Sequence, residues 1–280
     1  MTVDPGGPIH LIGKRLGLAL GAGAIHGAAH IGVLKALEER FLRPDLLAGT
    51  SIGALVAALY AFGLAPGEIE TIALEMDWLD VGKFAPNRLG LMSIERLERR
   101  FEERVGRVRF EDARIPFAVI ATDIGTGEAV VLREGPVASA VAASACIPGV
   151  FHPIERDGRL LVDGGLVESV PLSPLRTMGA EFTIGVNLGH RRRYRRPKNL
   201  IELLSNVFDV ATRNRTKTPQ DVANLLIAPN LGSYRKTWAD AEEIEEMIAE
   251  GHRAATEALE SLAQAADARP GVESTGRSAT

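Results

Sequence analysis

The sequence has very little cysteine and no surplus of positive charge. Among its 280 residues only Cys146 is a cysteine, so no disulfide can form within the chain. The apolar run 145–147 around it is typical of a buried structural thiol. The 32 basic and 36 acidic residues leave a net charge of -4, which offers no overall positive field to nucleic acid. We therefore expect no nucleic-acid partner.

Metal-binding and targeting motifs are also missing. There is no His-Glu-x-x-His motif and no second cysteine, so the sequence predicts no metal site and no bound cofactor. Residues 1–10 carry neither a basic leader nor an apolar core, so we expect a cytoplasmic protein. We also expect it to contact the membrane peripherally. Three uncharged stretches are long enough to suggest membrane spans. Glycine, histidine or proline interrupts each one, so each is interpreted as a buried strand and helix or a broken helix: 16–34, 46–67 and 135–154.

Apolar residues, by contrast, make up 46% of the chain, which is enough to form one sizeable core. Within 16–62 a strand, a glycine turn and a helix are followed by a second strand, a sharp turn and a second helix. This alternation is typical of an α/β fold with a parallel sheet. The later elements are predicted as a helix at 137–146, a hairpin at 154–162 that turns at Asp157-Gly158, and strands at 115–124, 128–133, 181–188 and 225–228.

Composition divides the chain into an N-terminal extension, a core, a C-terminal packing region and a disordered tail: residues 1–15, 16–190, 191–265 and 266–280. Within the core, the segment at about 66–110 is more charged and less apolar, and it is interpreted as a helical lid or insertion. The packing region begins with a basic loop at 191–198. Two amphipathic packing helices are predicted to follow, at 200–211 and about 241–265.

A serine lies between a predicted strand and a predicted helix, in Gly49-Thr50-Ser51-Ile52-Gly53. A sharp turn of this kind leaves room only for glycine close to the serine and pushes the hydroxyl out at the carboxyl end of the sheet. The helix N-terminus adds a partial positive charge that stabilises a developing alkoxide. The motif therefore indicates Ser51 as a nucleophile, flanked by Gly49 and Gly53.

A glycine-rich loop, Gly21-Ala22-Gly23-Ala24-Ile25-His26-Gly27, joins the first strand to the first helix. One interpretation is a phosphate-binding loop. The loop departs from the dinucleotide fingerprint G-x-G-x-x-G because its third glycine comes one residue late, and it lacks the G-K-[ST] ending of a phosphate loop. A second interpretation is an oxyanion hole, in which backbone N–H groups face a carbonyl oxygen that becomes negative. The third is a turn that only lets the strand and the helix pack.

A serine hydroxyl needs a base to accept its proton. Asp163, which precedes Gly164 and Gly165 after the predicted hairpin, is one candidate, and Asp123 at the end of a strand is another. His190 is the main rival, because it follows a strand and completes the chain order serine, aspartate, histidine of α/β-hydrolases. Its arginine neighbours disfavour an imidazolium at that position. From spacing alone these alternatives stay open.

The glycine loop, the G-x-S-x-G motif and the Asp163-Gly164-Gly165 motif, in this order, closely resemble those of the patatin-like phospholipase family. Further matching segments are Ala19-Leu20-Gly21, Ala29 to Leu34, Ala121-Thr122-Asp123, and Ala143 to Pro148 with Phe151 and Pro153. The similarity extends over residues 16–188, approximately, and looks most like the compact bacterial-type members. Three ordered motifs are far more specific than any one of them.

The resemblance implies a three-layer α/β/α sandwich with a mainly parallel central sheet, and a serine–aspartate dyad without a catalytic histidine. It implies Ser51 as the nucleophile and Asp163 as the general base. The same resemblance implies an oxyanion hole formed by Ala22, Gly23 and Ala24, with Gly21, His26 and Gly27 completing the motif. The family usually has glycine at Ala22 and Ala24, and arginine or lysine at His26. Alanine keeps the N–H donor but adds strain wherever φ must be positive.

The implied activity is hydrolysis of carboxylic esters of lipids, of the phospholipase A or lysophospholipase type, through an acyl-enzyme. The expected partners are a lipid or ester substrate and, through the basic loop 191–198, an anionic membrane. A solvated loop is the alternative for that stretch. Two alternatives remain for the whole protein: a non-enzymatic or regulatory adaptor on the same fold, and a Ser-Asp-His esterase that uses His190.

Overall fold

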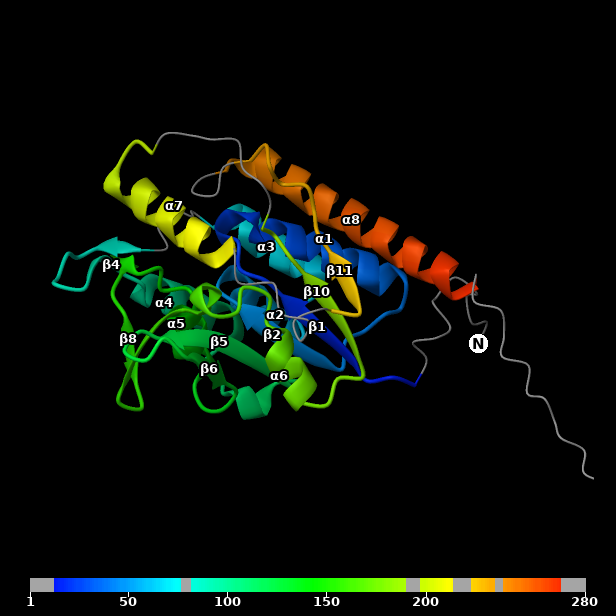
Figure 1. Cartoon of the computed structure of the whole chain (residues 1–280), viewed down its shortest axis with the longest axis horizontal. Helices are drawn as coiled ribbons and strands as arrows, with labels where there is room; N and C mark the ends of the chain where they lie inside the picture. Colours follow the sequence, from blue (N-terminus) through cyan, green and yellow to red (C-terminus); the bar gives the residue numbers. More distant parts are fainter. Residues whose placement is uncertain (1–12, 77–81, 190–196, 214–222, 235–238, 268–280) are drawn as a thin grey trace, which may run out of the picture.

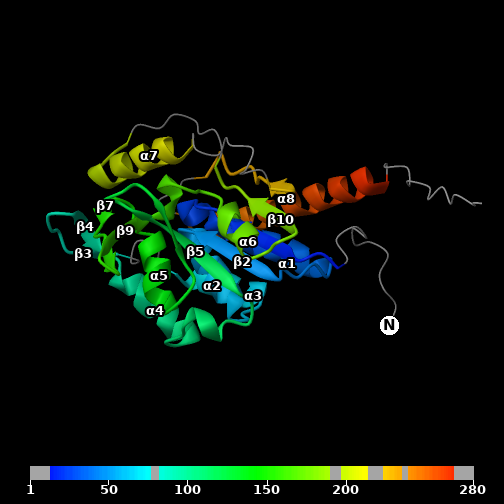
Figure 2. The same cartoon turned by 60° about the horizontal axis from the view of Figure 1, so that its bottom comes forward.

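The computed structural model describes residues 13–76, 82–189, 197–213, 223–234 and 239–267. At its centre lies a sheet in the order β11-β10-β1-β2-β5-β9-β8, with β6 also paired to β5. Helices cover both faces of this sheet (Figures 1 and 2). The predicted α/β/α sandwich is therefore confirmed, and its sheet is parallel from β11 through β5.

The strands of the central sheet are short and, near its middle, fully buried. Their bounds are β1 Leu16–Leu20, β2 Leu46–Thr50, β5 Phe117–Asp123, β6 Ala129–Leu132, β8 Ile154–Arg156, β9 Arg159–Asp163, β10 Phe182–Val186 and β11 Leu225–Ile227. A second, small sheet contains β3 Lys83–Phe84, β4 Gly90–Ser93 and β7 Gly149–Phe151. Buried parallel strands are expected to be continuously apolar, which explains how they could be predicted.

The helices begin and end at Ala28–Glu39 (α1), Ile52–Ala61 (α2), Pro66–Glu75 (α3), Glu95–Val105 (α4), Val137–Ser144 (α5), Leu172–Thr177 (α6), Leu200–Arg213 (α7) and Ala241–Asp267 (α8). Alternate residues of a strand point to opposite faces. Leu18 and Leu47 accordingly join the core formed with α1 and α2, whereas Ala19 and Ala48 pack against α6.

Helix α8 packs along α1 at very close range. A Cβ on Gly32 would lie 1.9 Å from the carbonyl oxygen of Ile248, and one on Gly251 would lie 2.0 Å from the carbonyl oxygen of Ala29. The two backbones approach closely because neither glycine has a side chain. The C-terminal helix therefore fixes α1, which follows directly on the glycine-rich loop.

Strand β5 brings distant parts of the chain together. Its residues 119–122 pair with β6 along one edge. Its residues 117–120 pair with β2, and its residues 121–123 pair with β9. Both pairings overlap with that of β6, so β2 and β9 share the other edge of β5 and lie end to end along it.

The segment at 66–110 contains more than the helices expected of it. Helices α3 and α4 are separated by the β3–β4 hairpin, and residues 77–81 between α3 and the hairpin lie outside the described part of the chain. The hairpin predicted at Asp157-Gly158 is present between β8 and β9, with φ of 53° and 74° at these two residues. Positive φ at both central positions is the geometry that this dipeptide favours.

Candidate active site

Ser51 occupies a strained turn between β2 and α2. Its φ of 56° and ψ of -124° lie in a region that residues with a side chain rarely adopt. A Cβ on Gly49 would lie 2.4 Å from the Cα of Ala54, and one on Gly53 would lie 2.1 Å from the carbonyl oxygen of Leu20. The two glycines of the motif are thus required by close packing on either side of the serine.

Asp163 is the last residue of β9 and is fully buried. Its Oδ1 accepts a hydrogen bond of 2.8 Å from the backbone N–H of Gly165. Its carbonyl oxygen accepts another, of 2.9 Å, from the hydroxyl of Thr122. These contacts hold both the backbone and the carboxylate of Asp163 in a defined orientation.

The ends of β2 and β9 meet at consecutive positions of β5. Thr50, directly before Ser51, is in register with Ile120, and Asp163 is in register with Ala121. The two strands run in opposite directions along the same edge of β5 and both reach their carboxyl ends there. The structure thus brings Ser51 and Asp163 together although 111 residues of sequence separate them.

Ser144, at the end of α5, connects the serine turn to β5. Its hydroxyl oxygen accepts a hydrogen bond of 2.8 Å from the backbone N–H of Ser51, and the hydroxyl donates one of 2.6 Å to the carbonyl oxygen of Ile120. Ser144 is fully buried, so no water competes for these contacts. A buried hydroxyl with both partners satisfied holds the turn rigidly.

The glycine-rich loop contacts both motifs. A Cβ on Gly27 would lie 2.2 Å from the side chain of Ile52, the residue after Ser51, and one on Gly165 would lie 3.4 Å from the methyl group of Ala22. The loop therefore passes beside the serine turn and the Asp163 loop. The three motifs of the sequence meet in one place.

Backbone N–H groups of this loop differ in what they bind. The N–H of Ala22 donates to the carbonyl oxygen of Ser169 at 2.9 Å. Within the described part of the chain, the N–H groups of Gly23 and Ala24 have no hydrogen-bond acceptor. The N–H groups of Gly23 and Ala24 thus remain available to an incoming oxygen, whereas that of Ala22 holds the loop to Ser169.

His30 fixes the start of the same loop from α1. Its Nε2 donates a hydrogen bond of 2.8 Å to the carbonyl oxygen of Gly21. Burial lowers the pKa of His30 from 6.5 to about 4, although the hydrogen bond to Gly21 opposes the shift. His30 is therefore neutral near pH 7 and acts as a hydrogen-bond donor inside the core.

The three departures of the loop from the family pattern have different structural consequences. Ala24 has a φ of 51°, so the positive φ that strains alanine is present there. Ala22 does not have a positive φ. His26 is fully buried, and thus this position presents no side chain to the solvent.

The rival candidates for the base differ in their surroundings. Asp123 Oδ1 accepts a hydrogen bond from the N–H of Gly125 at 2.9 Å, and its Oδ2 lies 3.9 Å from Nε of Arg159. The Asp123 carboxylate is therefore committed to a turn and an ion pair. His190 lies outside the described residues. Cys146 is buried beside Asp163, and burial together with that carboxylate raises the pKa of its thiol, as expected of a structural cysteine.

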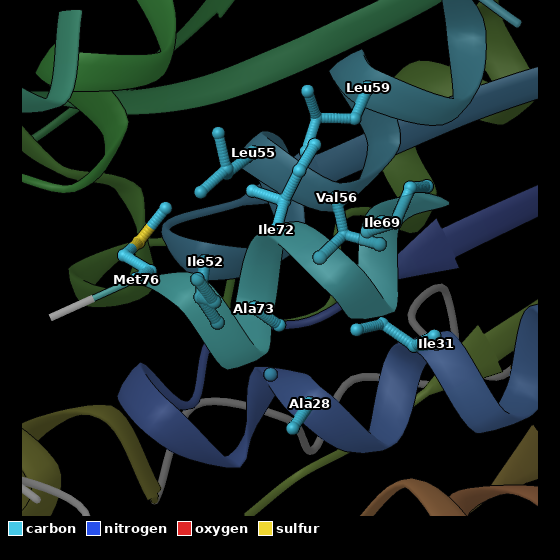
Figure 3. Close-up of a pocket in the computed structure, with 11 residues that line it drawn as sticks. Ala28, Ile31, Ile52, Leu55, Val56, Leu59, Ile69, Ile72, Ala73 and Met76 are labelled. Atoms are coloured by element: carbon cyan, nitrogen blue, oxygen red, sulfur yellow. The ribbon is translucent and has the colours of Figure 1, made fainter. Parts of the chain in front are cut away.

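A narrow apolar pocket lies between α1, α2 and α3. Figure 3 shows Ile52 and Met76 at one end of it and Ile31 and Ile69 at the other. Because Ile52 follows Ser51 directly, the first end of the pocket lies beside the serine turn. Its lining is entirely apolar and is completed by Gly27, Ala28, Leu55, Val56, Leu59, Ile72 and Ala73.

Metal-ligating side chains do not cluster in the described ranges, where no three His, Cys, Asp or Glu residues are arranged to hold an ion. Among the helices described, none has both the length and the apolar character that crossing a bilayer requires.

Comparison with known proteins points to the same family as the three motifs. Residues 18–176 match the family model described as Patatin-like phospholipase. The chain belongs to the patatin-like phospholipase family.

Relatives of this patatin-like chain occur in bacteria and animals. An uncharacterized NTE family protein of Mycobacterium tuberculosis is 37% identical over 177 residues, which cover 62% of this chain and 49% of that protein. Patatin-like phospholipase domain-containing protein 6 of Homo sapiens is 33% identical over 193 residues, which cover 64% of this chain and 14% of that protein. The chain thus spans about half the length, or less, of these relatives.

Two solved structures share the patatin-like fold. VipD from Legionella pneumophila matches with a TM-score of 0.57 at 13% identity, over 90% of this chain and 67% of VipD. Full-length ExoU, in complex with SpcU from the type III secretion system of Pseudomonas aeruginosa, matches with a TM-score of 0.52 at 17% identity, over 90% of this chain and 53% of the other. At such low identity the likeness shows the fold alone.

Proposed function

We propose that this protein is a serine acyl hydrolase that cleaves carboxylic esters of lipids, of the phospholipase A or lysophospholipase type. The observation that supports this most is the meeting of β2 and β9 at consecutive residues of β5, beside the glycine-rich loop. A nucleophile, a base and oxyanion donors must lie within a few ångströms of one another to catalyse acyl transfer. In this proposal the turn at Ser51 is a nucleophile elbow.

The reaction begins when the Asp163 carboxylate accepts the Ser51 proton as the serine oxygen attacks the ester carbonyl. The tetrahedral intermediate then collapses, the C–O bond to the alcohol breaks, and protonated Asp163 returns its proton to the departing alcohol. Water next attacks the acyl-enzyme with Asp163 again as the base. The bond between the acyl carbon and the Ser51 oxygen then breaks, Asp163 returns the proton to Ser51, and the fatty acid leaves. General base catalysis contributes about 10²- to 10⁴-fold to such a reaction.

The oxyanion of the intermediate is stabilised by the N–H groups of Gly23 and Ala24. A single such donor is worth about 10²- to 10³-fold in kcat. The family resemblance also implies Ala22 as a donor, but its N–H is bound to Ser169, so we assign Ala22 an anchoring role. His30 keeps the loop in place through the carbonyl of Gly21.

The acyl chain of the substrate enters the apolar pocket between α1, α2 and α3. This assignment is supported by the apolar lining and by the position of Ile52 next to the nucleophile. An acyl chain is stabilised by roughly 0.8 kcal/mol for each CH₂ group it buries. Lipids with such chains are held in bilayers, so the proposal includes peripheral contact of the protein with an anionic membrane.

A fluorophosphonate probe tests the nucleophile directly, because it labels only an activated serine. We expect the native protein to be labelled and to hydrolyse esters, and Ser51→Ala to do neither. In Asp163→Asn the rate of ester hydrolysis should fall at least 100-fold. His190→Ala should retain activity. Unchanged hydrolysis by Ser51→Ala would reject the proposal.

Two other outcomes point to the alternative functions. If His190→Ala abolishes labelling while Asp163→Asn does not, the protein is a Ser-Asp-His esterase. If the native protein is folded but is not labelled at all and hydrolyses neither soluble nor lipid esters, the adaptor function is supported. Circular dichroism of each variant establishes that the loss is not a loss of folding.

A further inference from the structure

Helix α7 lies against the loop that follows Asp163. A Cβ on Gly165 would lie 3.1 Å from the ring of Phe208, and a Cβ on Gly149 would lie 3.2 Å from the side chain of Leu204. Helix α7 thus packs on β7 and on the short helix Gly164–Leu166. Figure 1 shows it, in yellow, on the outside of the molecule. Its inner face, formed by Leu204 and Phe208, therefore covers one side of the candidate site.

The outer face of the same helix is apolar as well. Leu200, Leu203, Val207 and Val210, here named the α7 stripe, are each between 46% and 63% exposed. Their spacing of three, four and three residues places them on one side of an α-helix. A surface helix ordinarily presents polar residues to water opposite its buried face. The α7 stripe departs from this rule and is suited to a second apolar environment.

Acidic residues of α7 do not interrupt the stripe. The Glu202 carboxylate accepts a hydrogen bond of 2.7 Å from the backbone N–H of Lys198, and Asp209 is buried. The β3–β4 hairpin lies at the same end of the molecule as the start of α7, as Figures 1 and 2 show. This hairpin also carries two exposed apolar residues, Phe84 and Leu89, which are 72% and 56% exposed.

Positive charge gathers in the sequence on both sides of α7. Six of the eight residues in 191–198 are Arg or Lys, and Arg213, Arg215 and Lys217 occur at the other end. The chain as a whole carries a net charge of -4, so this concentration is local. An apolar helix face with cations at its ends is typical of a helix that lies in the headgroup region of an anionic bilayer.

We propose that the α7 stripe is the membrane-docking surface of this protein and that it inserts into the interface of an anionic lipid bilayer. This inference rests on the proposed lipid hydrolase function, because the inner face of α7 contacts the loop of Asp163. Docking through the stripe brings the candidate site to the membrane surface. Insertion itself needs no catalysis, so binding and hydrolysis can be tested apart.

Vesicle sedimentation measures the docking. We expect the native protein to bind vesicles of phosphatidylcholine and phosphatidylglycerol at 7:3 more tightly than vesicles of phosphatidylcholine alone. Leu203→Ser with Val207→Ser should lower the partition coefficient at least tenfold. The matched control is Val131→Ser with Leu226→Ser, which replaces two exposed apolar residues on β6 and β11 and should bind as the native protein does.

Depth of insertion is measured with Val207→Trp and brominated lipids. Quenching of the new tryptophan, relative to the native protein and to Leu226→Trp, supports insertion of the stripe. The proposal is overturned if the native protein binds neither vesicle, if the control pair loses binding equally, or if Val207→Trp is not quenched. It is also overturned if light scattering shows a dimer that the stripe substitutions convert to monomer without loss of vesicle binding.

Hydrolysis of a soluble short-chain ester separates this inference from the proposed function. The stripe variants should retain hydrolysis of p-nitrophenyl butyrate while losing vesicle binding. Loss of binding with activity absent in every form of the protein would reject the hydrolase and leave the docking surface standing. Ester hydrolysis together with unaltered vesicle binding in the stripe variants would reject the docking surface and leave the hydrolase standing.

Discussion

The backbone N–H of Ser51 donates a hydrogen bond of 2.8 Å to the hydroxyl oxygen of Ser144, 93 residues further along the chain. Because the Ser144 hydroxyl in turn donates to Ile120 of β5, the strained serine turn is attached to the strand against which β9 also ends. Strain of this kind persists only where the surrounding structure enforces it. We infer that Ser144 positions the nucleophile without touching the substrate.

Ser144→Ala should therefore lower kcat by roughly tenfold to 100-fold with little change in KM. Both buried partners lose their hydrogen bond, so the free energy of unfolding should fall by about 1 to 3 kcal/mol. Hydrolysis of a soluble ester and urea denaturation measure the two effects. Ser139→Ala in the same helix, where the hydroxyl makes contacts of 3.5 Å only, is the control. Equal kcat values for the two variants would contradict the positioning role.

His30 makes the stability of the fold depend on pH in a defined direction. Its pKa is about 4 in the folded protein against 6.5 in an exposed histidine. Between these values the unfolded chain binds a proton that the folded chain does not, so the free energy of unfolding falls as the pH falls from 6.5 to 4. The largest effect expected is about 3 kcal/mol.

His30→Gln tests this dependence, because glutamine can still donate to the carbonyl of Gly21 but does not titrate. Urea denaturation at several pH values between 4 and 7.5 should give a shallower pH dependence for the variant than for the native protein. Parallel curves for the two proteins would show that His30 does not cause the acid sensitivity.

Ala24 stores backbone strain that glycine would relieve. An L-residue in this region costs roughly 1 to 2 kcal/mol, and the greater freedom of glycine in the unfolded chain offsets part of the gain. Ala24→Gly should accordingly raise the free energy of unfolding by about 0.5 to 1 kcal/mol. Ala22→Gly is the matched control in the same loop and should be destabilising, since Ala22 has no positive φ. Chemical denaturation distinguishes the two signs.

Local patterns in the sequence were sufficient to predict most strands and helices. Apolar runs predict the alternating strands and helices of 16–62, and a turn dipeptide predicts the hairpin at Asp157-Gly158. The three motifs also named the residues that meet in the fold. Each of these features depends on residues close together in the sequence, and each is present in the structure.

What the sequence could not reveal depends on contacts between distant residues. The end-to-end arrangement of β2 and β9 follows from strand register, which packing determines. Ser144 and His30 stand within segments that match the family, yet a small hydroxyl and a histidine in apolar runs look like ordinary core residues. Helix α7 was predicted to pack, and its inner face does so, but the exposure of its outer face depends on what its neighbours leave uncovered.

The pocket next to Ser51 leads to a prediction about chain length. Ala73 lines this pocket on α3, and a leucine there would occupy space that a long acyl chain needs. Ala73→Leu should lower kcat/KM for a p-nitrophenyl ester with 12 acyl carbons at least tenfold relative to the ester with two, since each CH₂ excluded from the pocket forfeits roughly 0.8 kcal/mol.

The matched control for this substitution is Ala138→Leu on α5. Ala73 and Ala138 are each 8% exposed, so both replacements add the same volume to a nearly buried site, and overpacking should cost each of them a similar 1 to 3 kcal/mol, approximately. Thermal unfolding of both variants corrects for that loss. Only Ala73→Leu should change the ratio of long-chain to short-chain hydrolysis, because Ala138 does not line the pocket. An identical ratio in the two variants would place the acyl chain elsewhere on the protein.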